Sequence, residues 1–260
     1  MPEVNMSKKK VLITGASGMI GGDLYDRLSA SYEMRGCDLE NHENISDFHQ
    51  VDGKNFKSYL PAFEGVDTVI DLASIPSATS PWEIISENNI PCMYNALEAA
   101  KQSGVRRLIF ASSNHVTGMY EFDNPYHSII SGKYDKLDPL KIPYITKSMA
   151  IRPDGPYGIG KALGEAAGRY YSDKFGLSVI CLRIGTFNAE DKPINARNFA
   201  TLITHNDFEK LVSCSIEAPD NVKFDIFYGV SNNLWRFWDL ENARKTIGFH
   251  PTDNAENWRS

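Results

Sequence analysis

Short apolar runs alternate with amphipathic stretches along the first two thirds of the chain. The apolar run Val11-Leu12-Ile13 stops at Thr14-Gly15, and an amphipathic stretch follows from Met19 to Ala30. Such a run is typical of a buried strand, and the stretch after it is typical of a helix with one apolar face. The pattern therefore predicts a strand, a glycine turn and a helix.

The same alternation recurs farther along the chain. The pattern predicts further strands at 32–37, 69–72, 108–110 and 179–182, and helices at 89–103 and 160–175. Parallel strands need crossover connections long enough to hold a helix, so this alternation predicts a parallel sheet covered by helices. We expect an α/β fold of the Rossmann type, which is a doubly wound parallel sheet.

The remaining segments depart from this alternation. Residues 121–156 are rich in Pro, Tyr, Asp and Lys without clear periodicity, which predicts an irregular insertion. We expect a Rossmann domain over residues 1–182. Residues 183–260 should then form a small lobe, not an independent domain, over the carboxyl ends of the strands, where ligands bind in sheets of this kind.

Composition narrows the classes of function. A chain of 260 residues, 42% of them hydrophobic, can bury one substantial core. The net charge of −6 and the scattered basic residues give no electrostatic footprint for nucleic acid or for an anionic membrane. The sequence also lacks a run of about eighteen apolar residues, which a membrane span would need. A small soluble ligand is the expected partner.

The cysteines and the first residues bear on the compartment. Four cysteines lie far apart, with neither metal-ligand spacing nor the density of a disulfide scaffold: Cys37, Cys92, Cys181 and Cys214. No metal site is therefore predicted. Residues 1–10 are polar and end in three lysines, so we expect no signal peptide and a cytoplasmic protein.

A glycine motif lies at the first junction of strand and helix, Gly15-x-x-Gly18-x-x-Gly21. Gly15 permits the tight turn, Gly18 lets the backbone approach a pyrophosphate, and Gly21 lets helix and strand pack closely. The helix N-terminus favours the phosphate charge. A glycine string alone can be an ordinary turn, but its place between strand and helix favours a dinucleotide-binding loop.

A carboxylate stands at the end of the second predicted strand, at Asp38. A carboxylate there accepts hydrogen bonds from a ribose diol and repels a 2′-phosphate, and no Arg follows it. The alternative is a surface Asp in a turn. Asp38 therefore favours NAD over NADP. Asp52-Gly53 is expected to end a further strand between those at 32–37 and 69–72, which makes Asp52 a second candidate near the adenine.

Tyr157 and Lys161 are four positions apart, so on the predicted helix they share one face. The hydroxyl of a free Tyr has a pKa of about 10. An adjacent ammonium and a positive nicotinamide ring would favour the phenolate, which predicts Tyr157 as a general base. The Y-x-x-x-K spacing also occurs by chance, and only its position after the strand-end serines gives it weight.

Ser113 and His115 follow the predicted strand at 108–110, at the edge where such a sheet presents catalytic groups. Ser113 is predicted to hydrogen-bond the substrate hydroxyl, with a helix or loop cap as the alternative. His115 is predicted to contact the substrate, with a satisfied core histidine as the alternative. Tyr157 keeps the role of base because only it has a cation one helical turn away.

Together these motifs resemble the extended short-chain dehydrogenase/reductase family, also called NAD-dependent epimerase/dehydratases. The matching residues are Thr14-Gly15-x-x-Gly18-x-x-Gly21, Asp38, Leu72-Ala73, Asn89, Ser112-Ser113, Tyr157-x-x-x-Lys161 and Arg183. The resemblance implies that Ser113, Tyr157 and Lys161 are the catalytic group. It implies that Tyr157 and Lys161 also contact NAD, together with Gly15, Ser17, Gly18, Met19, Ile20, Asp38, Asp52, Leu72, Ala73, Ser74, Asn89 and Ile184.

The resemblance is closer to uronate dehydrogenases and to archaeal-type hexose or hexose-phosphate dehydrogenases. It rests on Ala111-Ser112-Ser113-Asn114-His115, Arg152-Pro153-Asp154-Gly155-x-Tyr157-Gly158, Arg183-Ile184-Gly185, Thr204-His205-Asn206-Asp207-Phe208 and Pro251-x-Asp253-Asn254-Ala255-Glu256. It implies that Ser113, Asn114 and His115 line the sugar, and that Thr186 borders it. It also implies that Arg197 holds an anionic group, for which a guanidinium fork is suited.

Two departures from the uronate dehydrogenases leave the sugar open. Where they carry a substrate-binding serine after Leu-Gly-Gly, this chain has Leu72-Ala73-Ser74-Ile75-Pro76-Ser77, so the contact is lost or shifts to Ser74 or Ser77. The segment before Tyr157 is also longer and resembles the hexose-phosphate relatives. Its lysines either meet a phosphate or are simply solvated: Lys133, Lys136, Lys141 and Lys147.

The residues and the resemblance predict an NAD-dependent enzyme that oxidises the C1 hydroxyl of a uronate, an aldose or a hexose 6-phosphate to a lactone. The alternative is a nucleotide-sugar epimerase or dehydratase that retains NAD, although the segment after Arg183 is short for such a substrate. A third interpretation is an NAD-sensing protein without turnover.

Relatives often dimerise through a four-helix contact, for which helices 89–103 and 160–175 are the candidates.

Overall fold

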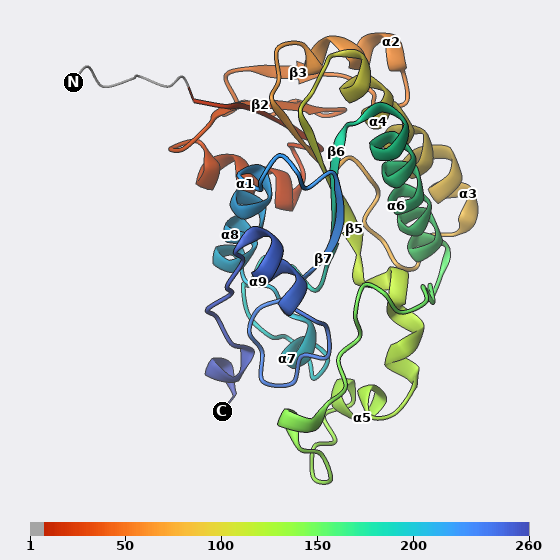
Figure 1. Cartoon of the computed structure of the whole chain (residues 1–260), viewed down its shortest axis with the longest axis vertical. Coiled ribbons are helices and arrows are strands. Elements are labelled where there is room, and N and C mark those ends of the chain that lie inside the picture. The colour runs from red at the N-terminus through yellow and green to blue at the C-terminus, as the bar shows by residue number, and fades with distance from the viewer. Residues whose placement is uncertain (1–7, 260) are drawn as a thin grey trace, which may run out of the picture.

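Residues 8–259 are described by a computed structural model, in which seven strands form one parallel sheet (Figure 1). The strand order is β3-β2-β1-β4-β5-β6-β7. The strands are β1 Lys10–Thr14, β2 Glu33–Asp38, β3 Phe48–Gln50, β4 Thr68–Asp71, β5 Arg107–Ser113, β6 Ser178–Ile184 and β7 Phe224–Gly229. The order reverses between β1 and β4, and ligands bind at this switch point in doubly wound sheets. The predicted fold class is confirmed.

Helices cover both faces of the sheet, with α1 and α8 on one side and α4 and α6 on the other (Figure 1). The α-helices of the described residues are α1 Met19–Leu28, α2 Phe56–Tyr59, α3 Trp82–Ile84, α4 Ile90–Gln102, α5 Tyr126–Ile130, α6 Pro156–Phe175, α7 Asn198–Thr201, α8 His205–Ile216 and α9 Glu241–Ile247. The buried apolar side chains divide accordingly into two clusters, one on each face. Helices α1, α4, α6 and α8 each bury one face against the sheet, which stabilises the layers.

Helix α6 begins at Pro156, before the predicted start at Gly160. Proline suits the first helical turn because its missing N–H would have no partner there. The helix ends at Gly176, whose φ of +74° lies in the left-handed region that glycine adopts readily. The earlier start places both Tyr157 and Lys161 on the helix, near its N-terminal end.

The predicted insertion over 121–156 is less irregular than its composition indicates. It contains the short helix α5, and Ile129 and Ile142 within it are buried. Ile145 is also buried and forms a β-bridge with Trp238. Short helical turns of this length leave no clear period in the sequence, so the pattern missed them.

The segment after Arg183 also differs from the prediction, because part of it belongs to the sheet. Strand β7 pairs with β6 in parallel, and α8 packs on the same face as α1. The part that lies over the carboxyl edge includes Thr186 and α7, which are joined by a β-bridge between Thr186 and Leu202. Residues 1–7, which hold most of the polar N-terminal stretch, and residue 260 lie outside the described residues.

Within residues 8–259, no helix is both long and apolar enough to cross a membrane.

Candidate active site

A cavity of about 760 Å³ lies at the carboxyl edge of the sheet. Its volume is typical of a small-molecule site, for which the usual range is roughly 300–1,000 Å³. It is lined by the loops after β1, β2, β4, β5 and β6 and by the start of α6. The structure brings all the predicted catalytic and cofactor residues to this cavity, and all the predicted substrate residues except Ser77.

The glycine loop after β1 packs so tightly that it needs its glycines. Gly15 has a φ of +71°, and a Cβ at Gly21 would lie 2.3 Å from the Gly15 carbonyl oxygen. Gly18 is the N-cap of α1 and offers no side-chain cap, while Met19 and Ile20 follow it along the cavity wall. The helix N-terminus therefore faces the cavity without a capping side chain, as a pyrophosphate site requires.

Two carboxylates line the cavity on the side of β2. The Asp38 carboxylate accepts the Ser17 N–H at 2.9 Å and the Leu39 N–H at 2.6 Å. Asp52 accepts the Lys54 N–H at 2.9 Å. Fixed carboxylates in this place fit a ribose diol and repel an additional phosphate.

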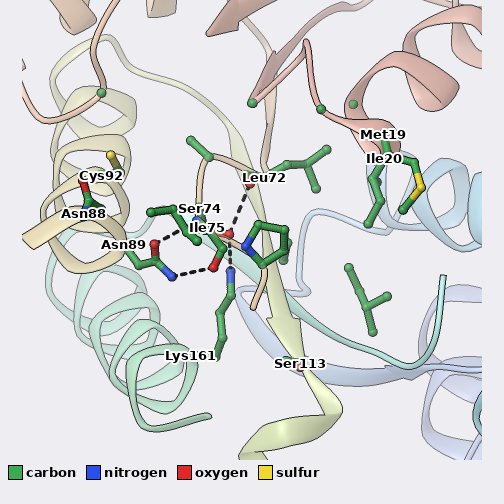
Figure 2. Close-up of a pocket in the computed structure, with 18 of the residues that line it drawn as sticks. Met19, Ile20, Leu72, Ser74, Ile75, Asn88, Asn89, Cys92, Ser113 and Lys161 are labelled. Carbon is green, nitrogen blue, oxygen red and sulfur yellow. Dashed lines mark hydrogen bonds between the residues drawn. The ribbon is translucent and has the colours of Figure 1, made fainter. Parts of the chain in front are cut away.

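The loop after β4 is fixed by side chains of the neighbouring elements. Thr14 Oγ1 accepts the N–H groups of Leu72 and Ala73 at 3.1 and 3.2 Å. Asn89 holds both polar groups of the Ile75 backbone, accepting its N–H at 2.9 Å and donating to its carbonyl at 3.1 Å (Figure 2). Asn89 thus positions the loop that carries Ser74 at the cavity wall.

Lys161 is buried beside this loop, with 5% of its surface exposed. Its ammonium donates to Ser74 Oγ at 3.1 Å (Figure 2). Burial lowers the pKa of Lys161 to about 8, while the charge of Asp71 raises it. Burial in turn raises the pKa of Asp71 to about 6. Asp71 was not predicted from the sequence, although a carboxylate that ends a buried strand was a signal for it.

Tyr157 differs from the expectation that the neighbouring ammonium would lower its pKa. Burial raises the pKa of Tyr157 to about 12, and the Ser113 hydroxyl only partly offsets this. The Lys161 nitrogen lies 5.5 Å from the centre of the Tyr157 ring and is hydrogen-bonded to Ser74. In the protein alone, desolvation of the phenolate therefore outweighs the attraction of the cation.

Ser113 and His115 lie next to Tyr157 at the end of β5. Ser113 Oγ accepts the His115 N–H at 3.2 Å, so Ser113 caps the turn that follows while it lines the cavity. The His115 ring lies edge to face with the Tyr157 ring at 5.8 Å, and its Nδ1 is 2.7 Å from the Asp154 carboxylate. Asp154 fits there because a Cβ at Gly118 would lie 2.0 Å from it.

Arg197 does not offer the open guanidinium fork that the resemblance implies. Its Nε and Nη2 donate to the two oxygens of Glu121 at 2.6 and 2.7 Å, and its Nη1 donates to Thr186 Oγ1 at 3.2 Å. Asn114, oriented to satisfy its neighbours, accepts from Arg197 Nη2 at 2.5 Å and donates to the Ile184 carbonyl at 3.0 Å. Glu121 carries no sequence motif and was missed.

Several predicted substrate contacts lie elsewhere. Ser77 does not line the cavity, and its hydroxyl is 3.1 Å from Thr79 Oγ1. Ser74 lines the cavity, so of the two serines it is the one placed for a contact with the substrate. The lysines of the insertion also lie off the cavity wall: Lys133, Lys136, Lys141 and Lys147.

A buried ionic network of Arg183, Glu165 and Ser112 holds the end of β5 in place. Arg183 donates from Nε and Nη2 to the two oxygens of Glu165, each at 2.8 Å, and Ser112 donates to the same carboxylate at 2.6 Å. Such a network fixes the backbone that presents Ser113.

Comparisons with known proteins find one family and several dehydrogenases that are similar to this chain. The model of the NAD dependent epimerase/dehydratase family matches residues 11–207. The NAD-dependent glucose-6-phosphate dehydrogenase of Haloferax volcanii is 32% identical, with 94% of each chain covered. The L-arabinose 1-dehydrogenase (NAD(P)(+)) of the same organism is 29% identical over 95% of this chain and 97% of its own. The crystal structure of uronate dehydrogenase from Agrobacterium tumefaciens superimposes with a TM-score of 0.82 at 31% identity, over 96% of this chain and 87% of that one.

Proposed function

Because the chain belongs to the NAD-dependent epimerase/dehydratase family, we propose that it is an NAD-dependent sugar dehydrogenase that oxidises the C1 hydroxyl of a monosaccharide to a lactone. The observation that carries this proposal is the meeting of Tyr157, Ser113 and Lys161 in the cavity that also holds the glycine loop. Relatives that match this chain over nearly its whole length are named as sugar dehydrogenases.

The cavity wall fits NAD along its length. The open N-terminus of α1 would hold the pyrophosphate, and Asp38 would accept the hydroxyl groups of the adenosine ribose. Ser17, Asp52, Leu72, Ala73 and Ile184 would complete the contacts, since each lines the same cavity. When bound, NAD supplies the hydride acceptor and a positive charge at its nicotinamide ring.

Tyr157 would accept the proton of the C1 hydroxyl while the hydride leaves carbon C1. With a pKa of about 12 in the protein alone, only about one Tyr157 in 100,000 would be ionised at pH 7. Tyr157 therefore becomes an effective base only when positive charge gathers around it. Lys161 contributes part of that charge, and Asp71 helps to keep its amine protonated.

The sugar would lie between Tyr157 and the start of α7. Ser113 would orient the C1 hydroxyl against the phenol, and His115, held by Asp154, would bind a neighbouring hydroxyl. Asn114, Thr186 and Arg197 would bind the far end of the ring. These roles use groups from the loops after β5 and β6, so we propose that residues 183–260 supply the substrate contacts that the Rossmann domain lacks.

Replacing the base tests this function. Tyr157→Phe removes only the hydroxyl, so we expect turnover to fall by about 10³-fold or more while the Kd for NAD changes little. The measurements are net NADH formation with a panel of sugars and calorimetric titration of NAD. Unchanged turnover would refute the assigned base. Sugar conversion without net NADH would instead support an epimerase or dehydratase that retains its cofactor.

We further propose a cytoplasmic homodimer. All four cysteines are free, as suits a reducing compartment. The two helices α4 and α6 lie side by side (Figure 1) and expose apolar side chains, Tyr94 and Leu163 among them. Pairing of these helices between two copies would cover that surface.

A further inference from the structure

We propose that Glu121 sets the substrate class: it neutralises Arg197, so the sugar end of the cavity takes an uncharged aldose and not a uronate or a sugar phosphate. The inference rests on the proposed function and adds to it the chemistry of the sugar. It reverses the role that the resemblance implies for Arg197, because the guanidinium that could bind a substrate anion is already paired with the Glu121 carboxylate.

The hydrogen bonds of Arg197 leave it little to offer a second carboxylate. A guanidinium has five N–H donors in a fixed fork. Glu121 takes one from Nε and one from Nη2, Asn114 takes the other from Nη2, and Thr186 takes one from Nη1. One N–H on Nη1 remains. A single donor can bind one hydroxyl group, but the two-pronged pairing that a carboxylate favours needs two.

Glu121 is well placed to keep its partner. Its side chain is 8% exposed, against 29% for Arg197, and it does not line the cavity. The carboxylate therefore lies behind the guanidinium as seen from the ligand. If a substrate anion drew Arg197 away, Glu121 would be left as a buried charge without its partner, which is strongly unfavourable.

The second basic side chain at this end of the cavity also has a carboxylate as its partner. His115 is paired with Asp154 at 2.7 Å. The ammonium groups on the cavity wall lie elsewhere, with Lys161 bound to Ser74 and Lys54 bound to Asn88 at 3.0 Å. A carboxylate or phosphate at the sugar end would therefore lose its hydration without gaining a free positive charge.

A neutral sugar loses no charge hydration on entering this site, and it finds polar partners there. The remaining N–H of Arg197, the Thr186 hydroxyl and the Asn114 amide are rigid polar groups of zero net charge once Glu121 is counted. Ring hydroxyl groups both donate and accept, so they can satisfy such groups without any charge compensation. The geometry is that of a site for hydroxyl groups.

The first experiment uses the wild-type protein and depends on no variant. We expect kcat/KM with NAD to be about tenfold or more higher for neutral aldoses, such as glucose, galactose and arabinose, than for glucuronate, galacturonate and glucose 6-phosphate. A higher value for a uronate or for the sugar phosphate would overturn the inference and leave the proposed function intact.

The second experiment frees Arg197. Glu121→Gln keeps the shape and one acceptor but removes the negative charge, so the ratio of kcat/KM for glucuronate over glucose should rise by about tenfold or more. Glu209→Gln on α8 is the control, since it removes the same charge outside the cavity and should leave the ratio unchanged. An unchanged ratio in a folded Glu121→Gln protein would overturn the inference.

Binding separates this inference from the proposed function. If no sugar gives NADH, the proposed dehydrogenase fails, but calorimetry of the NAD complex of Tyr157→Phe still compares glucose with glucuronate and glucose 6-phosphate. Tighter binding of glucose supports neutralisation by Glu121. Tighter binding of either anion, or binding of none of the three, overturns it.

Discussion

At the scale of single residues, burial controls the titration of the two central groups more than their mutual attraction does. It lowers the pKa of Lys161 to about 8 and raises that of Tyr157 to about 12, so both shifts favour the neutral forms. The cavity is thus prepared to respond strongly to any charge that enters it, because little solvent is present to screen that charge.

The cost of burying the charged Lys161 amine can be measured from the pH dependence of the free energy of unfolding. A folded pKa of about 8 against an unfolded value of 10.5 means that the charged amine costs about 3 kcal/mol at pH 7. Between these two values the unfolded chain binds more protons, so stability should rise with pH from about 8 to about 10.5. Lys161→Met should lack this rise and unfold at pH 7 with no smaller free energy, although turnover is lost.

Urea unfolding at pH 7, 8, 9 and 10 checks this prediction, with about 1.4 kcal/mol expected per pH unit from Lys161 alone. Lys174→Met, an exposed position on the same helix, serves as the control and should follow the wild-type pH dependence. Parallel pH profiles for wild type and Lys161→Met would show that the amine is not desolvated.

The residues that the sequence revealed are those whose meaning depends on local spacing. Tyr157 and Lys161 share a helix face, and Ser113 ends a strand, so their place could be predicted without the fold. Glu121 and Arg197 meet only because the chain returns to the same edge of the sheet 76 positions later. A contact of that separation leaves no pattern in one sequence, so the pairing of Arg197 with Glu121 could not be predicted.

At the scale of elements, the contact between α1 and the glycine loop is the tightest requirement of the cofactor site. Gly21 has no room for a side chain, since a Cβ would meet the Gly15 carbonyl oxygen at 2.3 Å. Its neighbour Gly22 has room, with the nearest atom at 3.7 Å. The pair offers a matched comparison on one helix.

We expect Gly21→Ala to push α1 away from the loop, to lose about 1–3 kcal/mol of stability, and to weaken NAD binding by about tenfold or more. Gly22→Ala should instead gain about 0.5–1 kcal/mol from helix propensity and bind NAD normally. Thermal or urea unfolding and NAD titration measure both effects. Equal behaviour of the two variants would mean that the close approach is not needed.

Element existence was easier to predict than element extent. The buried strands β1, β4, β5 and β6 are apolar runs bounded by polar residues, so the pattern found each of them within a few residues. β7 was missed because its first half is only partly buried at the edge of the sheet and mixes polar with apolar residues. The short helix α5 was missed because one turn leaves no period.

At the scale of the whole molecule, the cofactor and substrate parts of the cavity are not two consecutive segments of the chain. Both are built from loops at the carboxyl edge of the sheet. The predicted boundary at residue 182 falls inside β6, and β7 and α8 beyond it complete the sheet and its covering layer. The substrate groups come from loops that return to this edge. The specificity of the protein is therefore open to change through these loops without disturbing the sheet.

The outer face of α4 and α6 carries the exposed apolar side chains that the proposed dimer would cover. Tyr94 and Tyr170 are each 54% exposed, and Ile159 and Leu163 are each 44% exposed. Exposed apolar side chains on neighbouring helices can mark an interface, and pairing of these helices between two copies gives a twofold dimer. A single copy weighs 29.1 kDa, so light scattering should give a mass of about 58 kDa.

Charges placed in this face should separate the subunits. Tyr94→Lys combined with Leu163→Lys puts two like charges from each copy against each other, so the mass should fall toward 29.1 kDa. Leu140→Lys, at a position 89% exposed in the segment before α6, is the control and should remain dimeric. Because one chain lines the whole cavity, the separated subunit should keep its affinity for NAD. A wild-type mass of one chain at micromolar concentration would exclude this dimer.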